Sequence, residues 1–434
     1  MAFTRTDSGS NLGLILAMDN NSFTHASVPN FNFSNVLNAT PLCELSIIDT
    51  QSSFIRERSL GFLSIYFTNT TDDVTDKSSV VTGIIDDIGT TQGVSGNTTQ
   101  VIKWSAGTQS QLSNTTNAWN GTSVHALAKI FEERKVDFNN MAEGKVDVAD
   151  NMWWRFPQDT IWESLDTCVS HSYIRDDYLF WAWDDVNDIY KISSFNLEMA
   201  QDDRYLMIQS ESAKTSTSAG KSLLDNPKIT VWAFDNHVKR NELGKNRDKL
   251  YPNLYLSGSK DGEYKSSSVE KGCFSAVLGE MGDTSQVTIA EATDIKDPNT
   301  TFGPRKVVRH WPNNTHKFYS LAQMYREYKL ATYGKVVYVQ IYNQVGPPIG
   351  SKVTVLCAGN DYKIRGFSLD RHNSDKYILA EKFFDWGTEK PNRLLKTVPT
   401  SSEWVTTLKF ISNNVNDGDP DHIASILKAL GVNA

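Results

Sequence analysis

Residues 374–412 read SDKYILAEKFFDWGTEKPNRLLKTVPTSSEWVTTLKFIS. Both ends of this stretch are rich in the apolar, aromatic and branched side chains of β-strands, whereas its middle is polar. The polar middle is longer than the connection of an efficient hairpin, which has about two to five residues, and it gathers no catalytic residue type. We therefore predict two paired strands with an exposed connection whose purpose is not catalysis.

The composition is that of a folded, strand-rich protein. At 434 residues the chain exceeds the size at which one hydrophobic core keeps growing, so we expect about two to four packed units. Aromatic residues make up 11% of the chain, which favours strands and broad interfaces over a helical bundle. The formal charge of -8 argues against a protein that grips nucleic acid or an anionic membrane, because such binding needs a basic surface.

The sequence shows no signal for export, membrane insertion or metal binding. The first residues lack the features of a signal peptide, and no apolar run approaches the ~20 residues that span a bilayer, so we expect a protein made in the cytoplasm. The cysteines form no CxxC or Cys/His spacing, which indicates free buried thiols and neither a zinc site nor a disulfide scaffold. They are Cys43, Cys168, Cys273 and Cys357.

The first half of the chain predicts a strand unit followed by a helical unit. Four strand-like segments are bounded by turn residues and predict a compact β unit over residues 40–120; they lie at 41–50, 60–69, 79–89 and 99–106. Two helices follow: residues 121–133 can be capped by Thr122 or Ser123, and residues 159–173 by Asp159 or Thr160. An aromatic hairpin with a polar turn at 184–188 completes a small α+β unit.

The second half alternates between polar loops, a helix and strong strands. Residues 207–226 form a Ser/Thr-rich run that predicts a linker or surface loop. Residues 227–236 predict a short strand and residues 320–332 a helix, after which residues 335–356 predict two strands separated by Gly-Pro-Pro. Pro420 begins a final amphipathic helix.

A search for catalytic chemistry finds no strong motif. The sequence has no GxSxG, no phosphate-binding glycine loop and no HExxH. Asp184, Asp185 and Asp188 offer oxygen atoms, but the loop lacks the glycine and glutamate of a calcium site, so a solvated turn is the preferred interpretation. Glu163 is a candidate acid for sugar hydrolysis, with surface Glu as the alternative. The basic run 303–317, which includes Trp311, resembles a single-strand binding surface in composition only.

Several segments together carry a family resemblance. Lys376–Leu379 (KYIL) and Thr406–Phe410 (TTLKF) flank the long connection, and VGPPIGSKVTVLC precedes the turn. This pattern resembles the closing signature of the tail-hub family of contractile-tailed bacteriophages, whose relatives include the hub part of type VI secretion spikes. The segments at 41–133 are similar to the family's first tube-like barrel, and the segments at 153–195 to its inserted domain.

The resemblance implies a predominantly β, α+β fold with two tube-protein-like β-barrel domains, an inserted α+β domain and a C-terminal helix. The expected parts are a leader at 1–39, the first barrel at 40–120, the inserted domain at 121–225 and 262–319, the second barrel at 226–261 and 320–415, and the C-terminal helix at 416–434.

The resemblance also implies a non-enzymatic virion protein without cofactors or metals. It would be a homotrimeric baseplate hub that joins the sixfold tail tube to the threefold central spike, touches other baseplate wedge proteins and lets genomic DNA pass through its lumen without specific binding. The intersubunit positions that we select on the alternating strand faces are Tyr338, Gln340, Tyr342, Trp404 and Thr406. A tail-associated cell-wall hydrolase that uses Glu163 and a host-adsorption protein remain the alternatives.

Overall fold

The structure is a computed structural model, and a substantial part of the chain can be described in it. The described residues are 12–18, 21–24, 30–49, 62–69, 77–92, 98–106, 115–174, 177–185, 187, 189–209, 228–241, 254–257, 286–291, 306–310, 315–316, 319, 322, 326, 329–330, 333–342, 344–364, 367–370, 372–386, 404–413 and 428. Most of them lie in strands and few lie in helices, which confirms a predominantly β, α+β fold.

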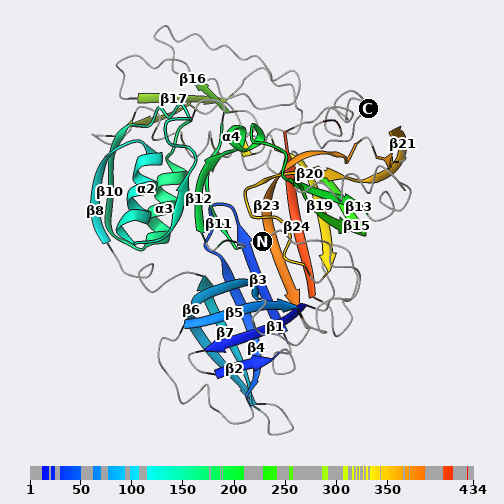
Figure 1. The fold of residues 1–434 in the computed structure, drawn as a ribbon. Helices are drawn as coiled ribbons and strands as arrows, with labels where there is room; N and C mark the ends of the chain where they lie inside the picture. Colours follow the sequence, from blue (N-terminus) through cyan, green and yellow to red (C-terminus); the bar gives the residue numbers. More distant parts are fainter. Residues whose placement is uncertain are drawn as a thin grey trace.

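A 14-stranded sheet dominates the fold, and half of its strands come from the N-terminal part of the chain (Figure 1). We call these the first strand set, which pairs in the order β3-β4-β7-β6-β5-β1-β2. Its members are β1 (Leu12–Met18), β2 (Asn21–Thr24), β3 (Asn30–Val36), β4 (Leu42–Asp49), β5 (Phe62–Asn69), β6 (Lys77–Gln92) and β7 (Thr98–Ala106). The four strands predicted from the alternating pattern are confirmed as β4 to β7. Three further strands lie in the segment expected as a leader.

The other half of the sheet, the second strand set, comes from the C-terminal part of the chain. It pairs in the order β14-β13-β20-β23-β24-β19-β15. Its members are β13 (Tyr205–Gln209), β14 (Thr230–Phe234), β15 (Asn236–Asn241), β19 (Lys335–Tyr342), β20 (Lys352–Leu356), β23 (Asp375–Trp386) and β24 (Trp404–Ser412). The two outer strands, β14 and β15, are separated in sequence by Asp235 alone. The set therefore curls so that its two ends approach each other.

Strand β23 belongs to both strand sets. On one side it pairs with β24 along most of its length. On its other side, Asp375 to Ile378 pair with β20, and Glu381 to Trp386 pair with β3 of the first set. An irregularity between Leu379 and Glu381 separates these two pairings. The quoted stretch thus supplies the strand that connects the two halves of the sheet.

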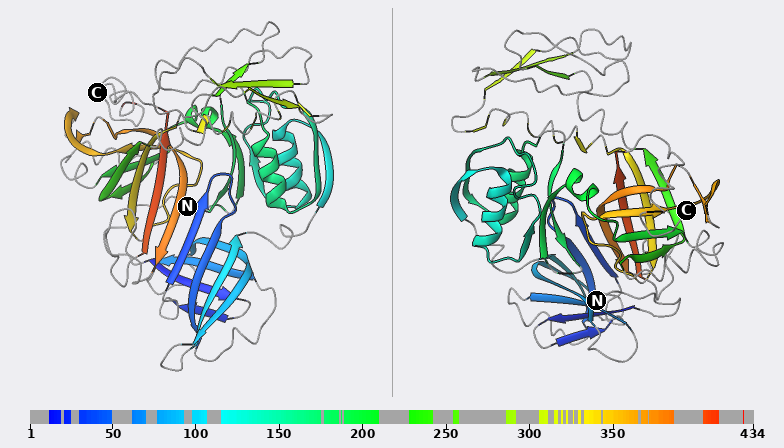
Figure 2. Two further views of the ribbon diagram at one scale, coloured as in Figure 1. Left: turned by 180° about the vertical axis from the view of Figure 1, so that it is seen from behind. Right: turned by 45° about the horizontal axis from the view of Figure 1, so that its top comes forward.

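A small α+β unit, here called the inserted unit, lies beside the junction of the two strand sets (Figures 1 and 2). Helices α2 (Ser123–Glu133) and α3 (Ile161–Ser170) follow Thr122 and Thr160, whose side chains cap them; each is one of the two cap residues that the sequence offers for its helix. Two short sheets cover the helices. The unit also contains β8 (Thr115–Gly121), β9 (Phe138–Asn140), β10 (Met152–Asp159), β11 (Leu179–Asp184), β12 (Ile189–Ser194) and α4 (Phe195–Met199).

Two peripheral sheets complete the described strands. They consist of β16 (Leu254–Ser257), β17 (Gln286–Glu291) and β18 (Lys306–His310), and of β21 (Ala358–Ile364) and β22 (Phe367–Leu369). Among the strands described above, no backbone ladder joins β2 to β3 or β14 to β15, so the two closed barrels stay a prediction. The predicted C-terminal helix, most of the helix at 320–332 and most of the loop predicted at 207–226 lie outside the described residues. The first three residues of that predicted loop are instead the end of β13, where the apolar Met207 and Ile208 are buried.

Candidate assembly site

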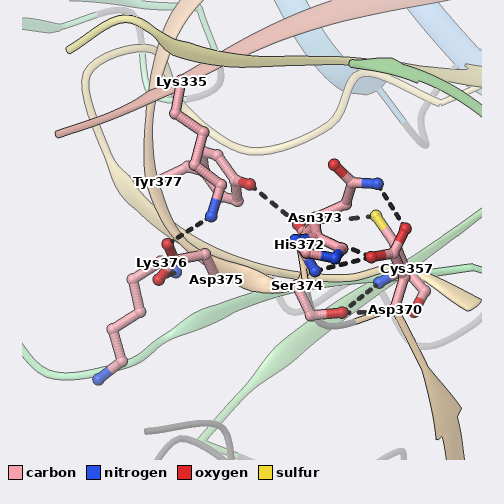
Figure 3. Close-up of polar contacts among 9 residues, drawn as sticks. All are labelled: Lys335, Cys357, Asp370, His372, Asn373, Ser374, Asp375, Lys376 and Tyr377. Carbon is pink, nitrogen blue, oxygen red and sulfur yellow. Dashed lines mark hydrogen bonds and ion pairs between the residues drawn. The ribbon is translucent and has the colours of Figure 1, made fainter. Parts of the chain in front are cut away.

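The turn that precedes β23 is built around one aspartate (Figure 3). The carboxylate of Asp370 accepts hydrogen bonds from the backbone N–H groups of His372, at 2.7 Å, and Asn373, at 3.2 Å. Its own backbone N–H donates to the carbonyl of Cys357, at 2.9 Å. A short acidic side chain that bonds the backbone two and three residues further on stabilises a tight reversal. Asp370 therefore builds the turn, and the turn sets where β23 begins.

One hydroxyl group ties this turn to Cys357, the residue after β20, and a second hydroxyl group holds the turn to β23 itself. The Oγ atom of Ser374 accepts from the backbone N–H of Cys357, at 3.0 Å, and lies 3.3 Å from the carbonyl oxygen of the same residue. The hydroxyl of Tyr377 donates to the carbonyl of Asn373, at 2.9 Å. Burial raises the pKa of the Cys357 thiol, so this cysteine stays protonated and unreactive. The cluster is a scaffold for the strand and has no activated nucleophile.

Buried ion pairs hold the start of β23 against its neighbours. The Nζ atom of Lys335 lies 2.8 Å from Oδ2 of Asp375, and both side chains are buried. In Figure 3 the next side chain, Lys376, points away from the turn; it lies 2.9 Å from Asp203, which also pairs with Lys352 at 3.1 Å. Buried charges are tolerated only when they are paired in this way. The register of β23 is thereby tied to β19, β20 and the segment before β13.

The other end of β23 contains a second buried pair, which links it to the inserted unit. The Nζ atom of Lys382 lies 2.8 Å from both carboxylate oxygens of Asp185, and the two side chains are 0% and 2% exposed. Burial raises the pKa of Asp185, and the charge of Lys382 opposes this increase. In the sheet, Lys382 lies opposite Leu408 of β24 and Asn35 of β3. The tip of the β11–β12 hairpin therefore reaches the place where the two strand sets meet.

One asparagine of β3 and one in the turn that follows β3 hold the same hairpin. The side chain of Asn35 donates to the carbonyl of Trp183, at 2.8 Å. Asn38 exchanges two bonds with Trp181: its carbonyl Oδ1 accepts from the Trp181 N–H at 2.9 Å, and its own N–H donates to the Trp181 carbonyl at 3.1 Å. Asn38 has a φ of 57°, a conformation that asparagine tolerates better than most residues.

Strand β11 is buried on both faces because it lies between two cores. Trp181 and Trp183 pack into a core that includes the helices of the inserted unit and Phe33 and Phe384 from the strands. Phe180 and Ala182 pack into the core of the second strand set. Side chains of a strand alternate between its faces, so the sequence LFWAW fills both cores at once. We call the meeting place of β3, β23 and the β11–β12 hairpin the junction.

The predicted intersubunit residues lie on β19 and β24. Three of them are buried within the chain: Gln340 donates to the Thr407 hydroxyl at 3.3 Å, Thr406 donates to the Gln344 carbonyl at 2.6 Å, and Tyr338 is 7% exposed. Tyr342 is half-buried, and the side chain of Trp404 lies outside the described residues. The structure brings these five residues to neighbouring strands, and their intersubunit role stays a prediction.

The carboxylates considered for chemistry have structural partners. The carboxylate of Glu163 accepts from the Thr160 N–H at 2.7 Å and from its hydroxyl at 2.9 Å, and these bonds lower the pKa of Glu163. A general acid needs the opposite shift. Asp184 accepts from Asn187, Asp185 pairs with Lys382, and Asp188 lies outside the described residues. No group of three or more His, Cys, Asp or Glu side chains in the described ranges is arranged to hold a metal.

A buried carboxylate in the inserted unit is also structural. Asp150 accepts hydrogen bonds from the N–H of Ser123 at 2.9 Å, from its hydroxyl at 2.6 Å and from the N–H of Tyr173 at 2.8 Å. Burial raises the pKa of Asp150 to about 6, and these bonds limit the increase. The three donors connect the start of α2 to the segment after α3, so Asp150 holds the two helices together.

The junction residues Lys382, Asn35 and Asn38 were not singled out by the sequence. One signal for Lys382 was present: it lies in phase with Ile378, Ala380 and Phe384, so the alternating pattern turns its side chain toward the core. A lysine at such a position requires a buried acidic partner. The sequence does not indicate which of its many aspartates that partner is.

No protein family and no curated protein matches the sequence. Several solved structures align with this chain over most of its length. A tail protein from Neisseria meningitidis is 11% identical over 95% of this chain and 99% of its own, with a TM-score of 0.41. An Escherichia coli type VI secretion component, described as structurally similar to the phage T4 tail proteins gp27 and gp5, is 8% identical over 93% and 78%, with a TM-score of 0.42.

A prophage tail protein from Listeria monocytogenes is 10% identical over 96% of this chain and 98% of its own, with a TM-score of 0.36. The chain is similar to phage tail and type VI secretion proteins. The resemblance stated from the sequence was to tail-hub proteins and type VI secretion spikes, which belong to the same two groups. None of the described helices has the length and apolar character needed to cross a bilayer.

Proposed function

We propose that this protein is a structural component of a phage tail, the trimeric baseplate hub between a sixfold tail tube and a threefold central spike. The observation that carries the proposal is that one chain contains two strand sets, joined through β23. Each set has seven strands, and in each set the two end strands follow one another in sequence.

The symmetry argument is geometric. Closed rings of identical subunits have cyclic symmetry, and a chain with two similar tube-like sheets presents six of them when three copies assemble. Such a trimer can face a sixfold tube on one side and a threefold spike on the other. In this trimer, each strand set is proposed to close into a barrel, which gives two barrels per chain.

Strand edges in the described part of the chain also favour assembly. Strands β2, β14 and β15 each pair with one neighbouring strand among those described. An open strand edge exposes unpaired backbone groups and is stable in solution only when something covers it. Adjacent subunits, tube proteins and wedge proteins are the proposed covers of these edges. The proposed intersubunit residues Tyr338, Gln340, Tyr342, Trp404 and Thr406 lie on β19 and β24, which are paired on both sides, so these strands would meet a neighbouring subunit through a face of the sheet.

The formal charge of -8 suits a channel wall. Double-stranded DNA is strongly negative, and a surface without excess positive charge does not retain it. DNA is proposed to pass through the trimer without specific binding, and no cofactor or enzymatic step is required for that role.

The mass of the purified chain in solution tests the proposal. Light scattering or native mass spectrometry is expected to show a trimer, and electron microscopy is expected to show that the trimer caps preassembled tail tubes. A monomer that binds no tube would contradict the hub. A monomer that degrades peptidoglycan and loses this activity in Glu163→Gln would support the hydrolase instead.

A further inference from the structure

The Asp185–Lys382 pair occupies a distinctive position in the fold. Lys382 is in the segment of β23 that pairs with β24 on one side and with β3 on the other, so it touches both strand sets at once. Asp185 comes from the inserted unit, 197 residues earlier in the chain. One ion pair therefore joins three parts of the protein at the junction.

Aromatic rings pack around the lysine end of the pair. The Nζ atom of Lys382 lies 5.8 Å from the centre of the Phe384 ring. Phe33 packs against both Phe384, at 5.3 Å, and Trp183, at 6.1 Å between ring centres. A small rotation of one strand set relative to the other would separate the charges inside this apolar core, where water cannot replace either partner.

A buried ion pair contributes little to stability compared with apolar side chains of the same size, because desolvation offsets the attraction. It does penalise every arrangement in which the charges are apart, because each such arrangement leaves a buried charge unpaired. An apolar pair carries no such penalty, since hydrophobic contact is not directional. The Asp185–Lys382 pair is therefore suited to favour one orientation of the first strand set relative to the second.

We propose that Asp185 and Lys382 are positioning residues that fix the orientation of the first strand set relative to the second. This inference rests on the proposed function in one respect: in a trimeric hub, that orientation decides whether six sheets can form one ring. Replacing the pair by apolar residues should leave the chain folded and let the two strand sets move relative to each other.

The test uses the double variant Asp185→Leu/Lys382→Met in the full chain. Spin labels are placed on cysteines introduced at Gly89 of β6 and Ala233 of β14, which are exposed positions on the two strand sets. Cys273 is replaced by serine, while Cys43, Cys168 and Cys357 are buried and burial raises their pKa values, which protects them from labelling. Pulsed electron paramagnetic resonance then measures the distance between the labels.

In the labelled protein that keeps Asp185 and Lys382, the distribution of distances between the two labels is expected to be narrow. In the double variant it is expected to be broader or shifted. The matched control is Glu381→Leu/Lys409→Met, which removes the half-buried pair at 2.8 Å between β23 and β24 and leaves the Asp185–Lys382 pair with the inserted unit intact. This control should keep the narrow distribution. An unchanged distribution in Asp185→Leu/Lys382→Met would overturn the inference.

A third variant covers the case in which the double variant does not fold. Asp185→Asn/Lys382→Met removes both charges and keeps the shape of the Asp185 side chain, so broadening is expected there as well, and its absence overturns the inference. The trimer measurement is separate. A monomeric wild type contradicts the hub and leaves the orientation result standing, whereas a trimeric wild type with no broadening in the variants contradicts the positioning role alone.

Discussion

Lys335, the first residue of β19, forms a buried ion pair with Asp375, the first residue of β23, with Nζ 2.8 Å from Oδ2. The strand between them, β24, ends at Ser412, which lies opposite Lys335. The pair therefore crosses the end of a strand and connects its two neighbours. The ring of Tyr377, with its centre 5.4 Å from Nζ, covers the lysine.

Removal of this lysine should be costly. In Lys335→Met, Asp375 remains in a buried site without its cation, so we expect the free energy of unfolding to fall by about 3–5 kcal/mol. Denaturant titration measures the loss. The control is Lys409→Met, which removes a partly exposed pair with Glu381 and should cost only about 0–1 kcal/mol. If the free energy of unfolding fell equally in the two variants, burial would not determine the cost of breaking an ion pair in this protein.

Gly350 should not tolerate a side chain. It has a φ of +74°, and a Cβ atom there would lie 2.6 Å from a ring carbon of Phe180 on β11. Gly350→Ala combines the left-handed backbone with overpacking and should destabilise the protein by about 2–5 kcal/mol. Gly144, with a φ of +65° and no atom within 4 Å of such a Cβ, is the matched control. Gly144→Ala should cost about 1–2 kcal/mol, and thermal unfolding compares the two.

The turn before β23 should depend on the carboxylate of Asp370. In Asp370→Ala the N–H groups of His372 and Asn373 lose their acceptor, which should cost about 1–2 kcal/mol and speed the hydrogen exchange of these two amides. Asp370→Asn retains one oxygen acceptor and should have the smaller effect. If both variants exchange at the wild-type rate, the turn is held by other contacts.

His316 should make the protein less stable in acid. Its Nε2 atom lies 2.8 Å from the carbonyl oxygen of His171, and burial lowers the pKa of His316 from 6.5 to about 4. Between these two pH values the unfolded chain binds the proton and the folded chain does not, so stability falls as the pH falls from 6.5 toward 4. The largest contribution of this group is about 3 kcal/mol.

His316→Gln should remove that contribution to the pH dependence. Unfolding free energies measured from pH 4 to pH 7 should fall less steeply in the variant, and the ring of His316 in the wild type should titrate near pH 4 by nuclear magnetic resonance. A ring that titrates near 6.5 would show that the folded protein does not shield it.

The sequence by itself determined the local elements of this protein. Thr122 and Thr160 offer side-chain oxygens to free helix amides, and the alternating pattern of residues 41–50 and 335–342 specifies strands, because capping and periodicity act over a few neighbouring residues. The segments on either side of the 387–403 connection were also correctly expected to pair, as β23 and β24. The connection itself lies outside the described residues.

Only the tertiary structure decided how the strands are shared. The alternation of β23 shows that Lys382 faces inward, but not that β3 lies beside it or that Asp185 meets it from a hairpin far away in the chain. Strand pairing is made by backbone groups that are the same in every residue, so side-chain patterns specify a face and leave the neighbour open. The neighbour is selected by how the two cores fill around β11, and that is a property of the whole packed chain.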